Sequence, residues 1–96
     1  MADFLIRVEV EPWTPSGFMG VCRRLQAEGF STHVQLNGQR CALPPGEFVI
    51  SGPLSAQEVE DRAGEALRQL GLHFTLLTSR FVELRYQRDK AHQRAA

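Results

Sequence analysis

Hydrophobic and polar side chains alternate along residues 4–11, which read FLIRVEVE. A period of two places successive side chains on opposite faces of an extended chain, and here the β-branched residues share one face. Arg7 and Glu9 fall on the other, polar face. The pattern predicts a β-strand with one buried face, which ends at Pro12 because proline has no amide proton for a ladder.

The period changes to that of a helix after Pro12. Thr14 is the expected N-cap, with Pro15 at the first helical position, where its missing N–H costs nothing. The helix should run to about Glu28, with Gly29 just past its end in a left-handed conformation. Its single apolar stripe consists of Phe18, Val21, Cys22 and Leu25.

A β-hairpin gives the clearest local signal in the chain. Asn37-Gly38 lies between two alternating runs, and this dipeptide favours a two-residue type I′ turn. The turn fixes the register, with Gln35 opposite Arg40 and Val34 opposite Cys41. One face of the hairpin then carries Val34, Leu36, Cys41 and Leu43, and the other carries His33, Gln35, Arg40 and Ala42.

The second arm of the hairpin should break at Pro44-Pro45-Gly46 and resume as a strand over residues 47–51. A second helix is expected to begin after Ser55. The side chains of Ser55 and Glu58 have the spacing of a capping box, in which each satisfies a backbone N–H of the other. Gly71 should end this helix.

Two strand-like segments follow the second helix. Residues 72–78 (LHFTLLT) predict a core strand, and residues 81–86 (FVELRY) can extend as a fifth, edge-type strand. The element order is β-α-β-β-α-β, which predicts an α+β, ferredoxin-like fold with both helices on one face of a four-stranded antiparallel sheet. We expect one domain over residues 1–86 and a flexible basic tail over residues 87–96. The expected open face of the sheet carries Leu5, Arg7, Glu9, His33, Gln35 and Arg40.

The composition is that of a soluble globular protein, with 43% apolar and 23% charged residues. No apolar run approaches the roughly 20 residues that a membrane span requires. The N-terminal residues show no secretory signal, so we expect a cytoplasmic protein without a membrane partner.

The net charge of zero conceals an uneven distribution. Residues 80–96 hold five of the eleven Lys and Arg and two of the eleven Asp and Glu, a net charge of +3, which leaves −3 for the first 79 residues. A basic tail on an acidic body suggests contact with nucleic acid, with Arg80 and Arg85 as candidate ligands of phosphate. The alternative is a solvated terminus that keeps the protein soluble.

His33 is the one histidine expected on an ordered polar strand face. A histidine can exchange a proton near neutral pH, as the attack of an RNA 2′-hydroxyl on its own phosphate requires. Arg7 and Arg40 are candidates to hold that phosphate, and Glu9 or Glu11 is a candidate to assist as a base or to hold a metal. The alternative interpretation is that these side chains form the solvated side of a sheet.

Other chemistry has no support in the sequence. The chain has no Gly-rich phosphate loop, no nucleophile elbow and no metalloprotease helix. Cys22 and Cys41 form no CxxC pair and fall at apolar positions, so we expect two buried thiols. We therefore predict neither a metal site nor a cofactor.

Short motifs in a particular order give the chain a resemblance to a known family. They are Arg7-Val8-Glu9, Glu28-Gly29-Phe30-Ser31, Leu43-Pro44 followed by Glu47-Phe48, Leu54-Ser55, and the strand from Phe74 to Thr78. Through them, residues 4–78 resemble the GhoS-type antitoxins, which are small ferredoxin-like endoribonucleases of type V toxin–antitoxin pairs that act on the messenger RNA of a small membrane toxin. The resemblance implies an RNA-directed antitoxin, and it transfers no catalytic residue. Residues 80–96 depart from the family pattern, being longer and richer in arginine.

Two functional hypotheses follow. The first is a bacterial or phage regulator of the antitoxin type that binds RNA, with metal-independent cleavage as its proposed activity and His33 and Glu9 as the catalytic pair. The second is a non-catalytic module of the same fold that binds a protein partner or dimerises, for example a phage-encoded inhibitor of a host defence system. An unpaired strand at residues 81–86 would favour a homodimer. The alternative is that this strand returns to its own sheet.

Overall fold

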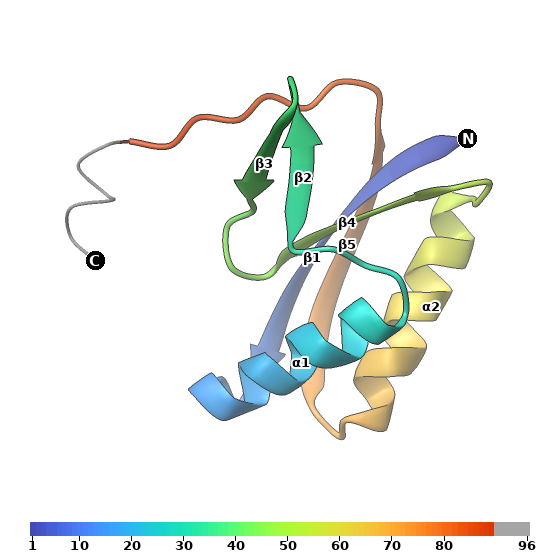
Figure 1. The fold of residues 1–96 in the computed structure, drawn as a ribbon. Helices are drawn as coiled ribbons and strands as arrows, with labels where there is room; N and C mark the ends of the chain where they lie inside the picture. The colour runs from blue at the N-terminus through green and yellow to red at the C-terminus, as the bar shows by residue number, and fades with distance from the viewer. Residues whose placement is uncertain (90–96) are drawn as a thin grey trace.

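The computed structural model describes residues 1–89 and shows an α+β fold. Strand β1 (Ala2–Glu11) lies at the centre of a three-stranded antiparallel sheet, between β4 (Glu47–Gly52) and β5 (His73–Phe81) (Figure 1). The predicted alternation in β1 is confirmed, since Phe4, Ile6, Val8 and Val10 are all buried.

Both helices cover the same face of this sheet (Figure 1). Helix α1 (Pro15–Ala27) begins as predicted, with the Gly17 N–H donating to Thr14 Oγ1 at 3.0 Å. Helix α2 (Ala56–Gln69) begins with the predicted capping box of Ser55 and Glu58. The core between helices and sheet contains Phe4, Ile6, Val21, Leu25, Phe48, Val59, Ala63 and Leu67. No helix in the part of the chain that the structure describes is long and apolar enough to cross a membrane.

The predicted hairpin is confirmed together with its register. Strands β2 (His33–Leu36) and β3 (Gln39–Ala42) pair with Val34 opposite Cys41 and Gln35 opposite Arg40. Asn37 and Gly38 both adopt positive φ angles, of 51° and 77°, as a type I′ turn requires.

The single four-stranded sheet of the prediction is not what the structure shows, because the hairpin forms a two-stranded sheet of its own. Ser31 pairs with Val49 of β4, so an unbroken ladder would place His33 opposite Glu47. His33 instead lies opposite Ala42. The residues between, 43–46, loop out, and the hairpin leaves the sheet at this point.

The loop at residues 43–46 is held to the sheet by one backbone contact. Pro44 and Pro45 have no N–H for a ladder, and Gly46 adopts a φ of 91°. The Gly46 carbonyl accepts a hydrogen bond from the Val8 N–H at 2.8 Å. The predicted break at Pro44-Pro45-Gly46 is therefore present, and it separates two sheets instead of interrupting one strand.

The prediction of a separate fifth strand at residues 81–86 is also wrong, because β5 ends at Phe81 and residues 82–89 form no strand. Conversely, β5 runs beyond the predicted end at Thr78. The ladder between β1 and β5 ends at the pair Asp3–Phe81, although Ala2, which would stand opposite Val82, still belongs to β1 and pairs with Gly52 of β4. Val82, the next residue, is 96% exposed. Most of the predicted flexible tail, residues 90–96, lies outside the described residues.

Candidate functional site

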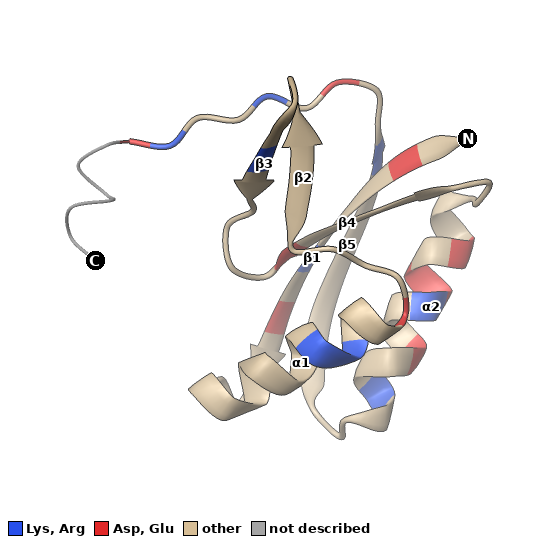
Figure 2. Ribbon diagram, viewed as in Figure 1, with Lys and Arg blue, Asp and Glu red and all other residues tan. Residues whose placement is uncertain are grey.

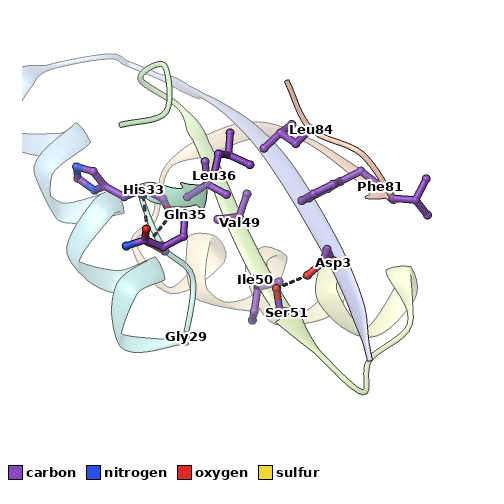
Figure 3. A pocket seen from close by; sticks show the side chains of 13 residues that line it. Asp3, Gly29, His33, Gln35, Leu36, Val49, Ile50, Ser51, Phe81 and Leu84 are labelled. Atoms are coloured by element: carbon purple, nitrogen blue, oxygen red, sulfur yellow. Dashed lines mark hydrogen bonds between the residues drawn. The ribbon is translucent and has the colours of Figure 1, made fainter. Parts of the chain in front are cut away.

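A cleft of about 470 Å³ opens between β2 and the residues that follow β5 (Figure 3). Leu36, Phe81 and Leu84 form apolar walls, and Val49 of β4 also lines it. Val49 lies on the sheet face opposite the helices and is nevertheless only 9% exposed. The hairpin therefore shelters this end of the sheet, although it belongs to a different sheet.

Polar groups lie at the two ends of the cleft. At one end the Ser51 hydroxyl donates to the Asp3 carboxylate at 2.6 Å (Figure 3). At the other end lie His33 and Gln35. Ser31 fixes the backbone of His33, because its hydroxyl donates to the His33 carbonyl at 2.8 Å and accepts from the His33 N–H at 3.1 Å.

The structure brings His33 and Arg40 together, as the predicted register requires. The Arg40 guanidinium lies 3.4 Å from His33 Nδ1, and the Thr32 hydroxyl lies 3.0 Å from the same nitrogen. A guanidinium can only donate, so its contact needs an unprotonated Nδ1, and a neutral ring then carries its proton on Nε2. In this arrangement Arg40 and the His33 ring both present N–H donors, as a phosphate ligand would require.

Further arginines follow the hairpin. Arg85 lies beside its turn, in a hollow of about 420 Å³ that Asn37 and Gln39 also line. Arg88 lies farther along, with Leu43 and Pro44. The segment after β5 thus contacts the hairpin both at its turn and at its base. Figure 2 shows in blue the Lys and Arg residues of this segment and of β3, and in red the acids of the segment. We call Arg40, Arg85 and Arg88 the arginine strip.

Arg80 lies apart from the arginine strip. It pairs with Phe4 in the ladder and therefore falls on the helix side of β5. Its side chain is exposed at the end of the strand. Of the two tail arginines predicted to bind nucleic acid, only Arg85 thus lies beside the hairpin.

The sheet face opposite the helices, which we call the open face, has the opposite charge. Its acids are Asp3, Glu9, Glu11 and Glu47, and among the described residues Arg7 is its one Lys or Arg. Arg7 lies opposite Glu47 in the ladder. Two of the predicted site residues, Arg7 and Glu9, are therefore in acidic surroundings on the three-stranded sheet.

The predicted catalytic pair of His33 and Glu9 is not assembled in the described part of the chain. The two residues belong to different sheets, they share no hydrogen bond and no cleft, and Glu9 lies opposite Thr75. The prediction placed them on one surface because it assumed a single four-stranded sheet. The departure of the hairpin from that sheet separates them.

His73 is a surface residue that the predicted core strand over residues 72–78 did not anticipate. His73 begins β5, is exposed, and lies opposite Glu11 on the open face, where it shares a shallow hollow with Glu9. The alternation of Phe74 and Leu76 with polar neighbours was the available signal, since it places His73 on the face away from the helices. Within residues 1–89 no group of three His, Cys, Asp or Glu side chains is arranged to hold a metal ion.

Neither cysteine contributes to a reactive site. Cys41 is buried and Cys22 is partly buried among the core residues, and both are free thiols. Burial raises the pKa of the Cys22 thiol, which disfavours the reactive thiolate.

Comparison with known proteins identifies no family. The sequence matches no protein-family model and no curated protein.

Proposed function

We propose that this chain is an RNA-binding regulator of the antitoxin type, similar to the GhoS-type antitoxins and built on a ferredoxin-like plan. The order of β1, α1, β4, α2 and β5 supports this plan, with the chain around Ser31 in the place of the remaining strand. The proposed ligand is single-stranded RNA. Its phosphates contact the arginine strip and His33, and a base enters the cleft beside Phe81.

The observation that carries the proposal is the separation of charge between the two sheets. The hairpin holds Arg40 and no acid, and residues 82–89 beside it hold two arginines and two acids, which gives this surface a net charge of +1. The open face carries four acids and Arg7. A polyanion is attracted to the first surface and repelled by the second.

The cleft beside the arginine strip has the chemistry that a nucleobase needs. Phe81 offers an aromatic ring to a stacked base, which is worth about 1–3 kcal/mol per base in single-strand binders. Gln35, Ser51 and Asp3 supply hydrogen-bonding groups along the same cleft. The chain thus combines phosphate contacts with a base site over a short distance.

RNA cleavage does not follow from this geometry. His33 has an arginine and a threonine hydroxyl beside Nδ1, and its predicted carboxylate partner lies on the other sheet. We therefore assign His33 to phosphate binding.

The test is the binding of a fluorescently labelled single-stranded RNA of mixed sequence, measured by anisotropy over a series of salt concentrations. The double substitution Arg40→Ala and Arg85→Ala should lower the affinity and reduce the slope of log K against log salt by about 1–2, since each phosphate contact contributes about 0.7 to that slope for single strands. Arg7→Ala is the matched control, because it removes the same side chain from the acidic open face. Equal losses in the two variants would refute the assignment.

The same samples separate binding from cleavage. Gel analysis of the RNA after incubation with and without EDTA should show intact RNA for the wild type. Cleavage that disappears in His33→Ala would restore the catalytic role predicted from the sequence, and would refute the assignment of His33 to phosphate binding alone.

A second candidate function is a non-catalytic protein-binding module. The acidic open face favours it, because this face also exposes Leu77, which is 66% exposed. A partner for this face would be a basic protein surface with an apolar centre. The absence of RNA binding at low salt would favour this candidate over the first.

A further inference from the structure

The outer edge of β5 is an unpaired strand edge in the part of the chain that the structure describes. β5 is the last strand in the order β4-β1-β5 and is nine residues long, whereas an average strand has about five or six. Natural proteins protect such edges with lysine, proline, bulges or short strands. β5 has none of these, and its one Lys or Arg is Arg80, next to its end.

Hydrogen bonds elsewhere in the sheet show which backbone groups of β5 point outward. The Val8 N–H donates to Gly46 on the β4 side of β1. Backbone groups two residues apart point the same way along a strand. The backbone N–H and C=O groups of Phe4 and Ile6 therefore also point toward β4, whereas those of Leu5 and Arg7 point toward β5.

The partners of Leu5 and Arg7 on β5 are Ser79 and Leu77. The backbone groups of these odd-numbered residues thus face β1, and the even-numbered ones face outward. The outward N–H and C=O groups are those of Phe74, Leu76, Thr78 and Arg80.

The edge is complementary to itself. When two copies of β5 pair in antiparallel fashion about a twofold axis at Leu77, the whole strand overlaps. Each outward residue then meets another outward residue, Leu76 opposite Thr78 and Phe74 opposite Arg80, so the register gives about eight backbone hydrogen bonds.

The side chains also match in this register. On the open face Leu77 meets its own copy, Thr75 meets Ser79, and His73 meets Phe81, so no two Lys, Arg, Asp or Glu side chains meet directly. Leu77 is the most exposed large apolar side chain of β5 and lies at the twofold axis. On the helix side, the partly exposed Phe74 and Leu76 would lose further contact with water.

We propose that this protein forms a homodimer through antiparallel pairing of β5 with β5 of a second copy, centred on Leu77. The two three-stranded sheets then form one continuous sheet of six strands. A rise of about 3.4 Å per residue places the two Phe81 residues about 27 Å apart, at opposite ends of the joined strands. The hairpin and the arginine strip lie on elements other than β5, and of the cleft residues only Phe81 belongs to the paired strand.

Cysteine cross-linking tests the register. Leu77 and its copy form a non-hydrogen-bonded pair with Cα atoms about 4.5 Å apart, within the range of a disulfide. Leu77→Cys should therefore give a covalent dimer on a non-reducing gel after treatment with diamide. Thr75→Cys is the matched control on the same face, because the two Thr75 Cα atoms would lie about 13 Å apart. The wild type controls for Cys22 and Cys41.

Sedimentation velocity over a roughly hundredfold range of protein concentration tests the dimer itself. Leu77→Lys places two ammonium groups across the twofold axis and should raise the dimer dissociation constant at least about tenfold. Met19→Lys, which adds the same charge at an exposed apolar position of α1, should leave the constant unchanged. A wild type that is monomeric at every concentration, a Leu77→Lys variant that dimerises normally, or equal cross-linking at positions 75 and 77 would each overturn the proposal.

Discussion

A substitution of Gly46 tests whether the backbone contact between Gly46 and Val8 fixes the point at which the hairpin leaves the sheet. Its φ of 91° is unfavourable for any side chain, and a Cβ atom added there would lie 2.9 Å from the Val8 carbonyl oxygen. The left-handed conformation alone costs alanine about 1–2 kcal/mol. The close approach of this Cβ atom to the Val8 carbonyl can be relieved only by moving the backbone of β1 or of the loop, which costs about 1–2 kcal/mol more. We therefore expect Gly46→Ala to lower the free energy of unfolding by about 2–4 kcal/mol.

Gly38→Ala is the matched control. Gly38 has a φ of 77° in the hairpin turn, but a Cβ atom there would have no neighbour within 4 Å. The free energy of unfolding of this variant should fall only by the cost of the left-handed conformation, about 1–2 kcal/mol. The difference between the two variants isolates the contact between Gly46 and Val8.

Urea unfolding followed by circular dichroism measures both values, since a domain of this size normally unfolds in one step. Equal losses in the two variants would refute the reasoning, because they would show that the loop moves away from β1 at no cost. A loss in Gly38→Ala larger than that in Gly46→Ala would refute it as well.

Other expected outcomes follow from single contacts. Ser55→Ala removes the hydroxyl that accepts from the Glu58 N–H at 3.1 Å and should cost about 1 kcal/mol in urea unfolding, whereas Ser16→Ala, inside the first turn of α1, should cost less. Ile6→Ala, at a fully buried position of β1, should cost about 2–5 kcal/mol, and a loss below 1 kcal/mol would contradict the assigned core. Because burial raises the pKa of the Cys22 thiol, this residue should react with iodoacetamide more slowly in the folded protein than in urea. The same shift makes the free energy of unfolding depend on pH. The contribution of the Cys22 thiol to stability should be fully present below about pH 8.5 and should be lost as the pH rises through the pKa of the folded state.

Local chemistry made much of the fold predictable. Thr14, the pair Ser55 and Glu58, and the dipeptide Asn37-Gly38 each set a helix start or a turn through interactions within four residues, and each is confirmed. Because a two-residue turn fixes which residues lie opposite each other, the contact between Arg40 and His33 could also be anticipated.

The arrangement of the strands depended on contacts between distant residues. The predicted end of β5 at Thr78 was wrong because pairing with β1 continues to the pair Asp3–Phe81. The composition of residues 81–86 suits a strand, but in the described part of the chain residues 82–86 form no strand. Sequence patterns describe the faces of a segment and not its partner, so this end of the chain was misassigned.

The break at Pro44-Pro45-Gly46 has consequences for function as well as for topology. The single sheet predicted from the sequence would have carried Arg40 and His33 onto the same surface as Glu9, where the acid would oppose the binding of a phosphate. The loop removes the hairpin from that surface, and residues 82–89, which form no strand, contact it and add Arg85 and Arg88. The arginine strip and the self-complementary edge of β5 therefore lie on different elements, and Phe81, at the end of β5, is the one residue that the proposed base site and the proposed dimer share.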